Sequence, residues 1–308
     1  MITYSHYLSI LGIILLVSLA GFYSSRFIHT AGDFFMGSRQ IGASLVGGFL
    51  VGAFVGGTST VGTAQMAYQY GISAIWFTVG GGLAGLVLGL FLVEPLRAGK
   101  VDTAPQFLAR TYGESVRPWV AVYTSVGMFI QVGAQGLAAI PILSSLFPVS
   151  AQLAAVLFTL ALLTCVIFGG FWGASLVGLI KVVLIYGILF IAGLTGYHLL
   201  GGFQGAHWAF PEGTWLSLFP QGKGKGLASV FSVVVGFIST QTYLQPVFAA
   251  KNNRSARLCV FLAAFLIPLA GLIATVIGLY MRASHPEIEP GKALPLFLVS
   301  YLNPWLGG

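Results

Sequence analysis

Eight long apolar stretches alternate with short polar segments along the chain. Each stretch has close to or more than the roughly 20 residues that an α-helix needs to cross a bilayer. Helices satisfy their own backbone groups in lipid, so the pattern predicts an all-α polytopic membrane protein with about eight transmembrane helices. The predicted spans cover residues 7–27, 41–67, 71–93, 116–143, 150–168, 174–200, 226–249 and 255–282.

The stretch at residues 41–71 is a poor continuous helix, because glycines recur along it and meet the polar run Gly56–Thr60. A glycine costs up to about 1 kcal/mol relative to alanine in a helix. Non-helical backbone at membrane depth is tolerated only where protein or a water-filled cavity satisfies it. Secondary transporters carry their binding sites at such breaks. We therefore expect an unwound solute and ion site near residues 52–59.

Close helix packing is the alternative explanation for these glycines, because Gly48, Gly52 and Gly56 are spaced by four. Packing does not require the polar run that follows them. The span at 71–93 has the same spacing without a polar cluster, and there we expect packing alone. Its glycines are Gly81, Gly85 and Gly89.

The span at 226–249 is also interrupted, by Gly236, the polar run Ser239–Thr242 and Pro246. It begins five spans after the span at 41–67, so a five-span repeat would enter the membrane in the opposite direction. Paired broken helices in inverted repeats point to a transport site. We expect one transmembrane domain over 1–308, with an extra N-terminal helix at 7–27, a first five-helix repeat at 41–200 and the start of a second at 226–308.

The composition agrees with a membrane protein, since 57% of residues are hydrophobic and 7% are charged, against about 25% charged in soluble domains. The net charge of +7 does not indicate a nucleic-acid partner. With the N-terminus outside, ten of the 14 lysines and arginines fall on the inner side, as the positive-inside bias requires. We expect a multi-pass protein of the plasma (inner) membrane with the bilayer as a partner.

Lys181 stands inside the apolar run GASLVGLIKVVLIYG. An ionisable residue within a span is a functional hypothesis by default. The alternative is that its amine reaches the membrane surface, since it lies about two helical turns from Gly173.

Gln241 and Gln245 present the same choice in the span at 226–249. Amides in hydrocarbon are costly unless paired, so they either line a cavity or bond to neighbouring helices. The spans contain no pair of carboxylates, and the chain has no nucleophile elbow, Walker loop or HExxH motif. Nothing in the sequence indicates an enzyme.

Several runs of the sequence resemble the sodium:solute symporter family of proline, pantothenate and sugar symporters. They are DFFMGSRQIG, AYQYGISAIW, DTAPQFLARTYG, FGGFWG and QPVFAAKNNRSAR, with Pro246 in place of the family's usual Arg. The resemblance implies a five-plus-five inverted-repeat (LeuT-like) fold after one extra helix. It also implies symport of a small organic solute with sodium as the coupling ion. By that template we expect an N-terminal portion that lacks the last core helices.

The resemblance also implies roles for individual positions. The backbone carbonyls of Gly52 and Val55 match sodium ligands of the family. Phe54 and Gly56 are less polar than their counterparts in the sugar and proline members, which argues against a polyhydroxylated sugar and leaves the solute open. The positions that match the solute pocket are Phe54, Gly56, Thr58, Ser59, Gly236, Thr240 and Gln241.

One departure from the family pattern concerns the coupling ion. Many members carry W-T-D-x-x-Q at the start of the helix that is the sixth span here, and their Asp lies close to sodium. In this chain Gly178 occupies the Asp position and Lys181 the Gln position. A gained cation repels sodium, so we expect the Lys181 ammonium to occupy or crowd the cation site. Burial favours the neutral amine, so proton-coupled or sodium-independent transport is the alternative to sodium symport.

Two further function classes remain open from the sequence: a membrane module that senses solute, and a truncated fragment. The sequence specifies neither the solute nor the oligomeric state.

Overall fold

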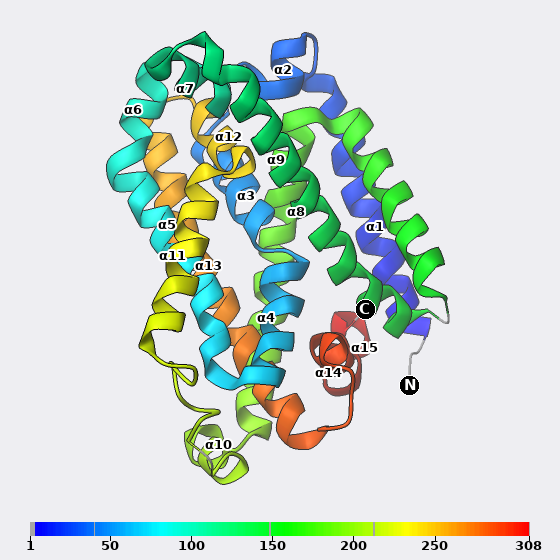
Figure 1. Cartoon of the computed structure of the whole chain (residues 1–308). Coiled ribbons are helices and arrows are strands. Elements are labelled where there is room, and N and C mark those ends of the chain that lie inside the picture. The colour runs from blue at the N-terminus through cyan, green and yellow to red at the C-terminus, as the bar shows by residue number, and fades with distance from the viewer. Residues whose placement is uncertain (1–3, 40, 148, 212, 308) are drawn as a thin grey trace.

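The computed structural model describes residues 4–39, 41–147, 149–211 and 213–307, which form a bundle of helices (Figure 1). Within these residues the extended contacts amount to one isolated bridge between Ile41 and Ala250. The helices are α1 (Tyr4–Ser24), α2 (Ala31–Met36), α3 (Ala43–Phe54), α4 (Gly57–Tyr70), α5 (Ile75–Val87), α6 (Val93–Ala98), α7 (Ala104–Tyr112), α8 (Arg117–Leu146), α9 (Ala151–Leu199), α10 (Gly202–Ala209), α11 (Lys223–Ser239), α12 (Gln241–Ala249), α13 (Asn253–Ser284), α14 (Ala293–Tyr301) and α15 (Pro304–Gly307).

All eight predicted spans have a helical counterpart in the described residues. Five helical stretches are long and apolar enough to cross a membrane, and the bent pair α11–α12 makes a sixth. The remaining two counterparts are shorter apolar helices, Ala43–Phe54 and Ala151–Leu160. The first is short because the second predicted span is broken in two.

The bend in α9 lies at Gly170 and joins the predicted spans at 150–168 and 174–200. Gly170 has a φ of +48°, a left-handed conformation that side chains rarely adopt. A Cβ built there would also lie 2.9 Å from the carbonyl oxygen of Phe34. Figure 1 shows the first arm of α9 rising towards α2 and the second descending towards α10.

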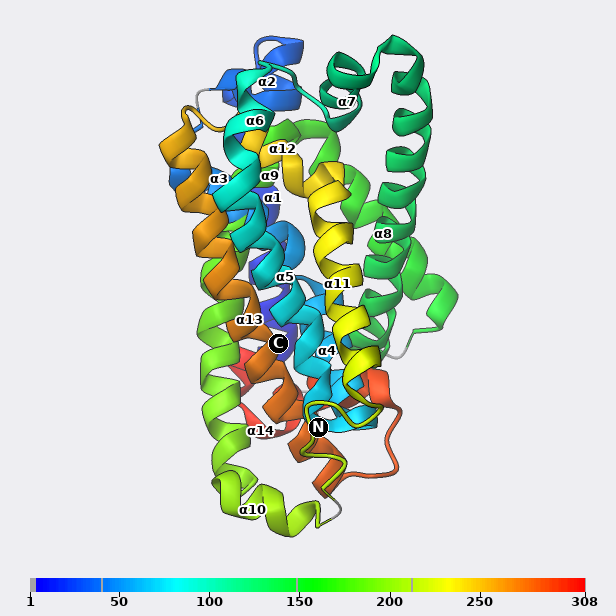
Figure 2. The ribbon, with the colours of Figure 1, turned by 60° about the vertical axis from the view of Figure 1, so that its left-hand side comes forward.

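Helix α13 is the centre of the core, where it packs against α3, α4, α5 and α9 (Figure 2). Glycines of α5 and of the π-helix that follows it (Leu88–Leu92) allow α13 to pack closely against them. A Cβ on Gly85 would lie 3.1 Å from Ala264 Cα, and one on Gly89 would lie 2.6 Å from the Phe261 ring. Gly81 instead makes room for the Phe54 ring. The prediction that these three glycines serve packing is confirmed.

One end of the bundle carries α2, α6, α7 and α12 and most of the arginines, and we call it the basic end (Figure 1). Arg39 pairs with Asp102 at 2.6 Å. Arg97 on α6 donates to the Val247 carbonyl oxygen of α12 at 2.6 Å. These contacts tie the surface segments at this end to the second broken helix.

Candidate functional site

The predicted break in the second span is confirmed between α3 and α4. Helix α3 ends at Phe54, and Val55 and Gly56 leave helical geometry before α4 begins at Gly57. Ser59 Oγ accepts the Gly56 N–H at 3.0 Å and donates to the Phe54 carbonyl oxygen at 2.8 Å. Thr60 donates to the Gly56 carbonyl oxygen at 2.8 Å. The polar run therefore satisfies the interrupted backbone, and Ser59, fully buried, acts as the cap of the break.

Lys181 reaches this break from α9. Its Nζ donates a hydrogen bond to the carbonyl oxygen of Gly52 at 2.7 Å, which is one of the two predicted cation ligands. The amine therefore points to the interior of the bundle and does not extend to the membrane surface. The other predicted ligand residue, Val55, is buried in the break itself.

Close packing of α3 on α9 makes the lysine contact possible. A Cβ on Gly52 would lie 2.8 Å from Gly178 Cα, and one on Gly178 would lie 2.5 Å from the Gly48 carbonyl oxygen. A carboxylate at position 178 therefore has no room in this packing. The lost Asp of the family pattern and the gained lysine belong to one local arrangement.

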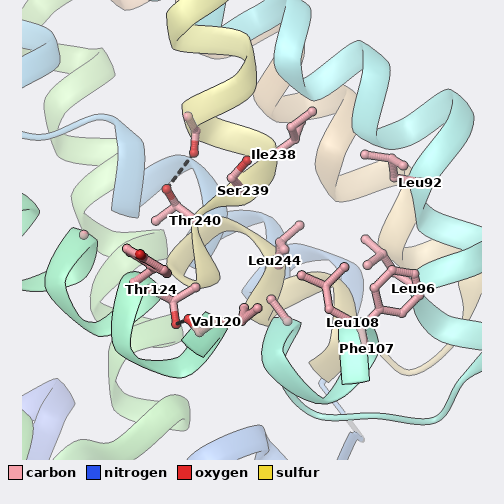
Figure 3. A pocket seen from close by; sticks show the side chains of 14 residues that line it. Leu92, Leu96, Phe107, Leu108, Val120, Thr124, Ile238, Ser239, Thr240 and Leu244 are labelled. Carbon is pink, nitrogen blue, oxygen red and sulfur yellow. Dashed lines mark hydrogen bonds between the residues drawn. The ribbon is translucent and has the colours of Figure 1, made fainter. Parts of the chain in front are cut away.

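The second break lies between α11 and α12, whose axes bend by 48°. Thr240 ends α11, and its hydroxyl donates to the Gly236 carbonyl oxygen at 2.6 Å (Figure 3). The Gln241 amide oxygen accepts the Ala104 N–H at 2.8 Å, and the amide nitrogen donates to Gln245 at 2.7 Å. Of the two roles considered for Gln241, the structure supports bonding to neighbouring segments.

An aromatic cluster of Phe54, Phe77, Phe237 and Tyr243 joins the two breaks. The Phe54 ring centroid lies 5.6 Å from Phe77, 5.5 Å from Phe237 and 5.7 Å from Tyr243. Phe237 and Tyr243 stack in parallel at 4.2 Å. Phe54, the last residue of α3, is therefore buried among rings from α5 and from the second broken helix.

A cavity of about 510 Å³ lies beside the first break, on the side away from the basic end, and we call it the central cavity. Its polar lining comes from Thr58, Gln65, Gln131 and Tyr243, and its apolar lining includes Val61, Met66, Phe77 and Leu137.

Amides of α8 support this lining. Gln131 donates to the Tyr243 hydroxyl at 2.6 Å and accepts from Thr242 at 3.3 Å. Gln135 donates to the Thr58 hydroxyl at 3.2 Å. Sequence reasoning missed both glutamines, although an amide inside an apolar span was the signal that singled out Gln241.

A second cavity of about 540 Å³ lies towards the basic end, between α6, α7, α8 and the second break (Figure 3). Gly236 and Thr240 line it together with Ser239, among mostly apolar side chains. The predicted solute residues are thus divided: Thr58 lines the central cavity, and Gly236 and Thr240 line the second. The other four line neither cavity: Phe54, Gly56, Ser59 and Gln241.

Comparisons with known proteins agree with this geometry. The model of the sodium:solute symporter family matches residues 34–288. A solved structure of a Na⁺-coupled sialic acid symporter, in a substrate-bound outward-open state, superposes with a TM-score of 0.83 at 16% identity. The alignment covers 99% of this chain and 67% of that chain. No curated protein sequence matches the chain.

At 16% identity the structural likeness establishes the fold, which is the LeuT-type fold of discontinuous helices. The family match covers well over half of the residues. On these two findings, the chain belongs to the sodium:solute symporter family.

Proposed function

We propose that this chain is the membrane core of a secondary active transporter, which moves a small organic solute with a cation by alternating access. The observation that carries the proposal is the meeting of two broken helices beside a cavity that is lined partly by polar and mostly by apolar side chains. Family membership supports the same function. We propose a five-helix repeat at 41–200, the start of an inverted copy at 226–308, and a plasma-membrane location with the N-terminus outside.

The central cavity is the proposed solute site. Its volume lies within the range of small-molecule sites, which run from about 300 to 1,000 Å³. Thr58 and Gln131 offer hydroxyl and amide groups for orientation, and Phe77 offers an apolar surface. Gly56 borders this region at the start of α4, where any side chain would press on Gln135 and Lys181.

For the coupling cation, the geometry favours a proton carried by Lys181. The Lys181 ammonium takes the Gly52 carbonyl oxygen that a sodium ion would need. Two unit charges 4 Å apart repel by about 4 kcal/mol at an effective dielectric constant of 20. A protonated Lys181 therefore replaces sodium at this carbonyl, and loss of its proton frees the carbonyl again.

Sodium remains the second candidate for the coupling ion, because the matched family is one of sodium:solute symporters. The backbone carbonyls of Gly52 and Val55 are oxygen ligands of the kind that hard cations accept. Sodium binding here requires that the Lys181 side chain withdraw from Gly52.

Transport itself is tested by accumulation in proteoliposomes that contain the full chain. A panel of labelled proline, benzoate, uracil and glucose is offered under an inward gradient of protons or of sodium. We expect one class of solute to accumulate above its external concentration under a cation gradient. Binding of a solute without accumulation under either gradient would replace the transporter with a solute sensor.

The coupling ion is tested by uptake with and without sodium at fixed pH, in the wild type and in Lys181→Gln. We expect wild-type uptake to follow the proton gradient and to persist when potassium replaces sodium. Lys181→Gln should lose the proton dependence. Full sodium dependence of the wild type that the substitution leaves unchanged contradicts the proton proposal and supports sodium symport.

A further inference from the structure

We infer that residues 213–222 form a movable strap beside the entrance to the central cavity, and that Arg282 is the latch that holds this strap against the bundle. The inference rests on the proposed transport function and deepens it, because it names the element that moves to admit the solute. The strap is a non-helical segment between α10 and α11, at the end of the bundle opposite the basic end (Figure 1).

The strap forms one wall of a groove that adjoins the central cavity. The groove has a volume of about 260 Å³, and residues 218–222 of the strap line it together with side chains of α4, α5 and α11. Met66 and Phe77 line both the groove and the central cavity. A solute that reaches the central cavity through this groove therefore passes along the strap.

Two hydrogen bonds fasten the backbone of the strap to the start of α5 and the turn before it. The Ile72 N–H donates to the Trp215 carbonyl oxygen at 2.9 Å. The Trp76 indole N–H donates to the Leu218 carbonyl oxygen at 2.7 Å. The Trp76 ring also packs on the Phe219 ring, with 5.1 Å between centroids. The strap is thus attached at several points to the opposite wall of the groove.

Arg282, in the last turn of α13, adds a contact of a different kind. Its guanidinium carbon lies 5.4 Å from the centroid of the Tyr68 ring and 5.2 Å from that of the Trp215 ring. Tyr68 belongs to α4, is 2% exposed, and donates its hydroxyl to the His285 carbonyl oxygen at 2.8 Å. Within the described residues Arg282 forms no ion pair. A guanidinium binds aromatic faces well, so Arg282 joins the strap to a buried ring of the bundle.

A glycine stands at each end of the strap. A Cβ built on Gly213 or on Gly222 would meet no atom within 4 Å, and Gly222 has a φ of +89°. Inside the strap, Ser217 N–H donates to the Thr214 carbonyl oxygen at 3.3 Å and Gly222 N–H to that of Phe219 at 3.0 Å. Hinges are loop positions that absorb a change of φ and ψ. The strap can therefore move as a unit about its two glycines when its outer contacts break.

Release of the latch is measured by hydrogen–deuterium exchange on the purified full chain in nanodiscs. Arg282→Gln removes the cation and should raise exchange of the peptide that contains Ile72 at least threefold, because the acceptor of the Ile72 N–H belongs to the strap. Arg282→Lys keeps a cation near the rings and should restore part of the protection. Lys223→Gln removes a positive charge from the exposed start of α11 and should leave exchange unchanged.

Access to the central cavity is measured by maleimide labelling of Thr58→Cys, a position in its wall, read on its own peptide by mass spectrometry. Arg282→Gln and Trp215→Leu should each raise the labelling rate several-fold. Trp76→Phe keeps a ring and removes one hydrogen bond of the strap, so a smaller increase is expected. Trp208→Leu removes an 87% exposed ring of α10 and should leave the rate unchanged.

An exchange rate or a labelling rate that stays at the wild-type value in both Arg282→Gln and Trp215→Leu would overturn the inference. An equal increase in Trp208→Leu would do the same, since it would indicate general loosening of this end. Circular dichroism and gel filtration establish that each variant is folded, and Trp76→Phe decides the matter if Arg282→Gln is not. Neither measurement uses a solute, so absence of accumulation in proteoliposomes would remove the transporter and leave the strap result unaffected.

Discussion

At the scale of single residues, the contact between Lys181 and Gly52 depends on the absence of side chains at three positions. Gly48 and Gly52 on α3 and Gly178 on α9 let the two backbones meet. Small residues that let helices approach are a known device of membrane bundles. Here the device also determines the chemistry, because it excludes an acid at position 178 and brings an amine to the break.

Substitution of one of these glycines should separate the two helices. Gly178→Ala should lower stability by about 1–3 kcal/mol, since its Cβ would press on the Gly48 backbone. Gly187 lies on the same helix with nothing within 4 Å of its built Cβ. Gly187→Ala should therefore keep or raise stability. Thermal unfolding in detergent measures both variants, and equal melting temperatures would argue against the close packing.

At the scale of the elements, each broken helix is closed by its own hydroxyl. Ser59 bridges the break between α3 and α4, and Thr240 bonds back to α11 at the second. The breaks are therefore defined structures with satisfied backbone groups. Because these bonds fix the backbone of the first break, the Gly52 carbonyl oxygen has a defined position for its bond with Lys181.

Removal of the first bridging hydroxyl should be costly. Ser59→Ala leaves the Gly56 N–H and the Phe54 carbonyl oxygen without their bonds to the hydroxyl. The two groups keep a bond to each other at 3.0 Å, so the expected cost is that of the lost hydrogen bonds, about 0.5–1.5 kcal/mol each. Ser25→Ala removes an exposed hydroxyl that bonds Phe22 and should cost far less. Chemical denaturation of both variants provides the comparison, and a Ser59→Ala value within error of Ser25→Ala would refute the bridging role.

The breaks could be predicted from the sequence because glycines and hydroxyls gather there in otherwise apolar spans. The partners of the amides could not. Gln241 and Gln131 both stand in apolar helices, yet Gln241 bonds the Ala104 backbone and Gln131 lines the central cavity. Whether an amide bonds a neighbouring backbone or lines a cavity depends on how its helix is rotated relative to its neighbours. Those neighbours lie more than 100 residues away in the sequence. The spacing along one span does not contain that information.

At the scale of the whole molecule, segments far apart in sequence are bonded to one another at the basic end. Arg97 donates to the Val247 carbonyl oxygen at 2.6 Å and to Asn253 at 2.8 Å. Arg39 bonds the Lys100 carbonyl oxygen and Asp102. The proposed alternating access would require such contacts to open when the solute leaves.

Loss of the Arg97 contacts should therefore favour the open form of the basic end. Ser239 lines the second cavity, so Ser239→Cys reports access to it by labelling with a membrane-impermeant maleimide. We expect Arg97→Met to raise the labelling rate several-fold from the basic side. Arg117→Gln breaks an exposed pair with Glu114, worth little, and should leave the rate unchanged. A rate insensitive to Arg97→Met would mean that Arg97 does not hold this end closed.

The Lys181 ammonium has a consequence for energetics, because this cation is tethered to the chain. A sodium symporter that imports a monoanion with more than one sodium ion carries net positive charge inward and draws on the membrane voltage. Under the proposed proton coupling, one proton would enter per cycle, delivered by an amine that stays behind, so the net charge carried inward would be one positive charge plus the charge of the solute. Uptake of a neutral solute should then increase with an inside-negative potassium diffusion potential set with valinomycin, whereas uptake of a monoanion should not respond to it.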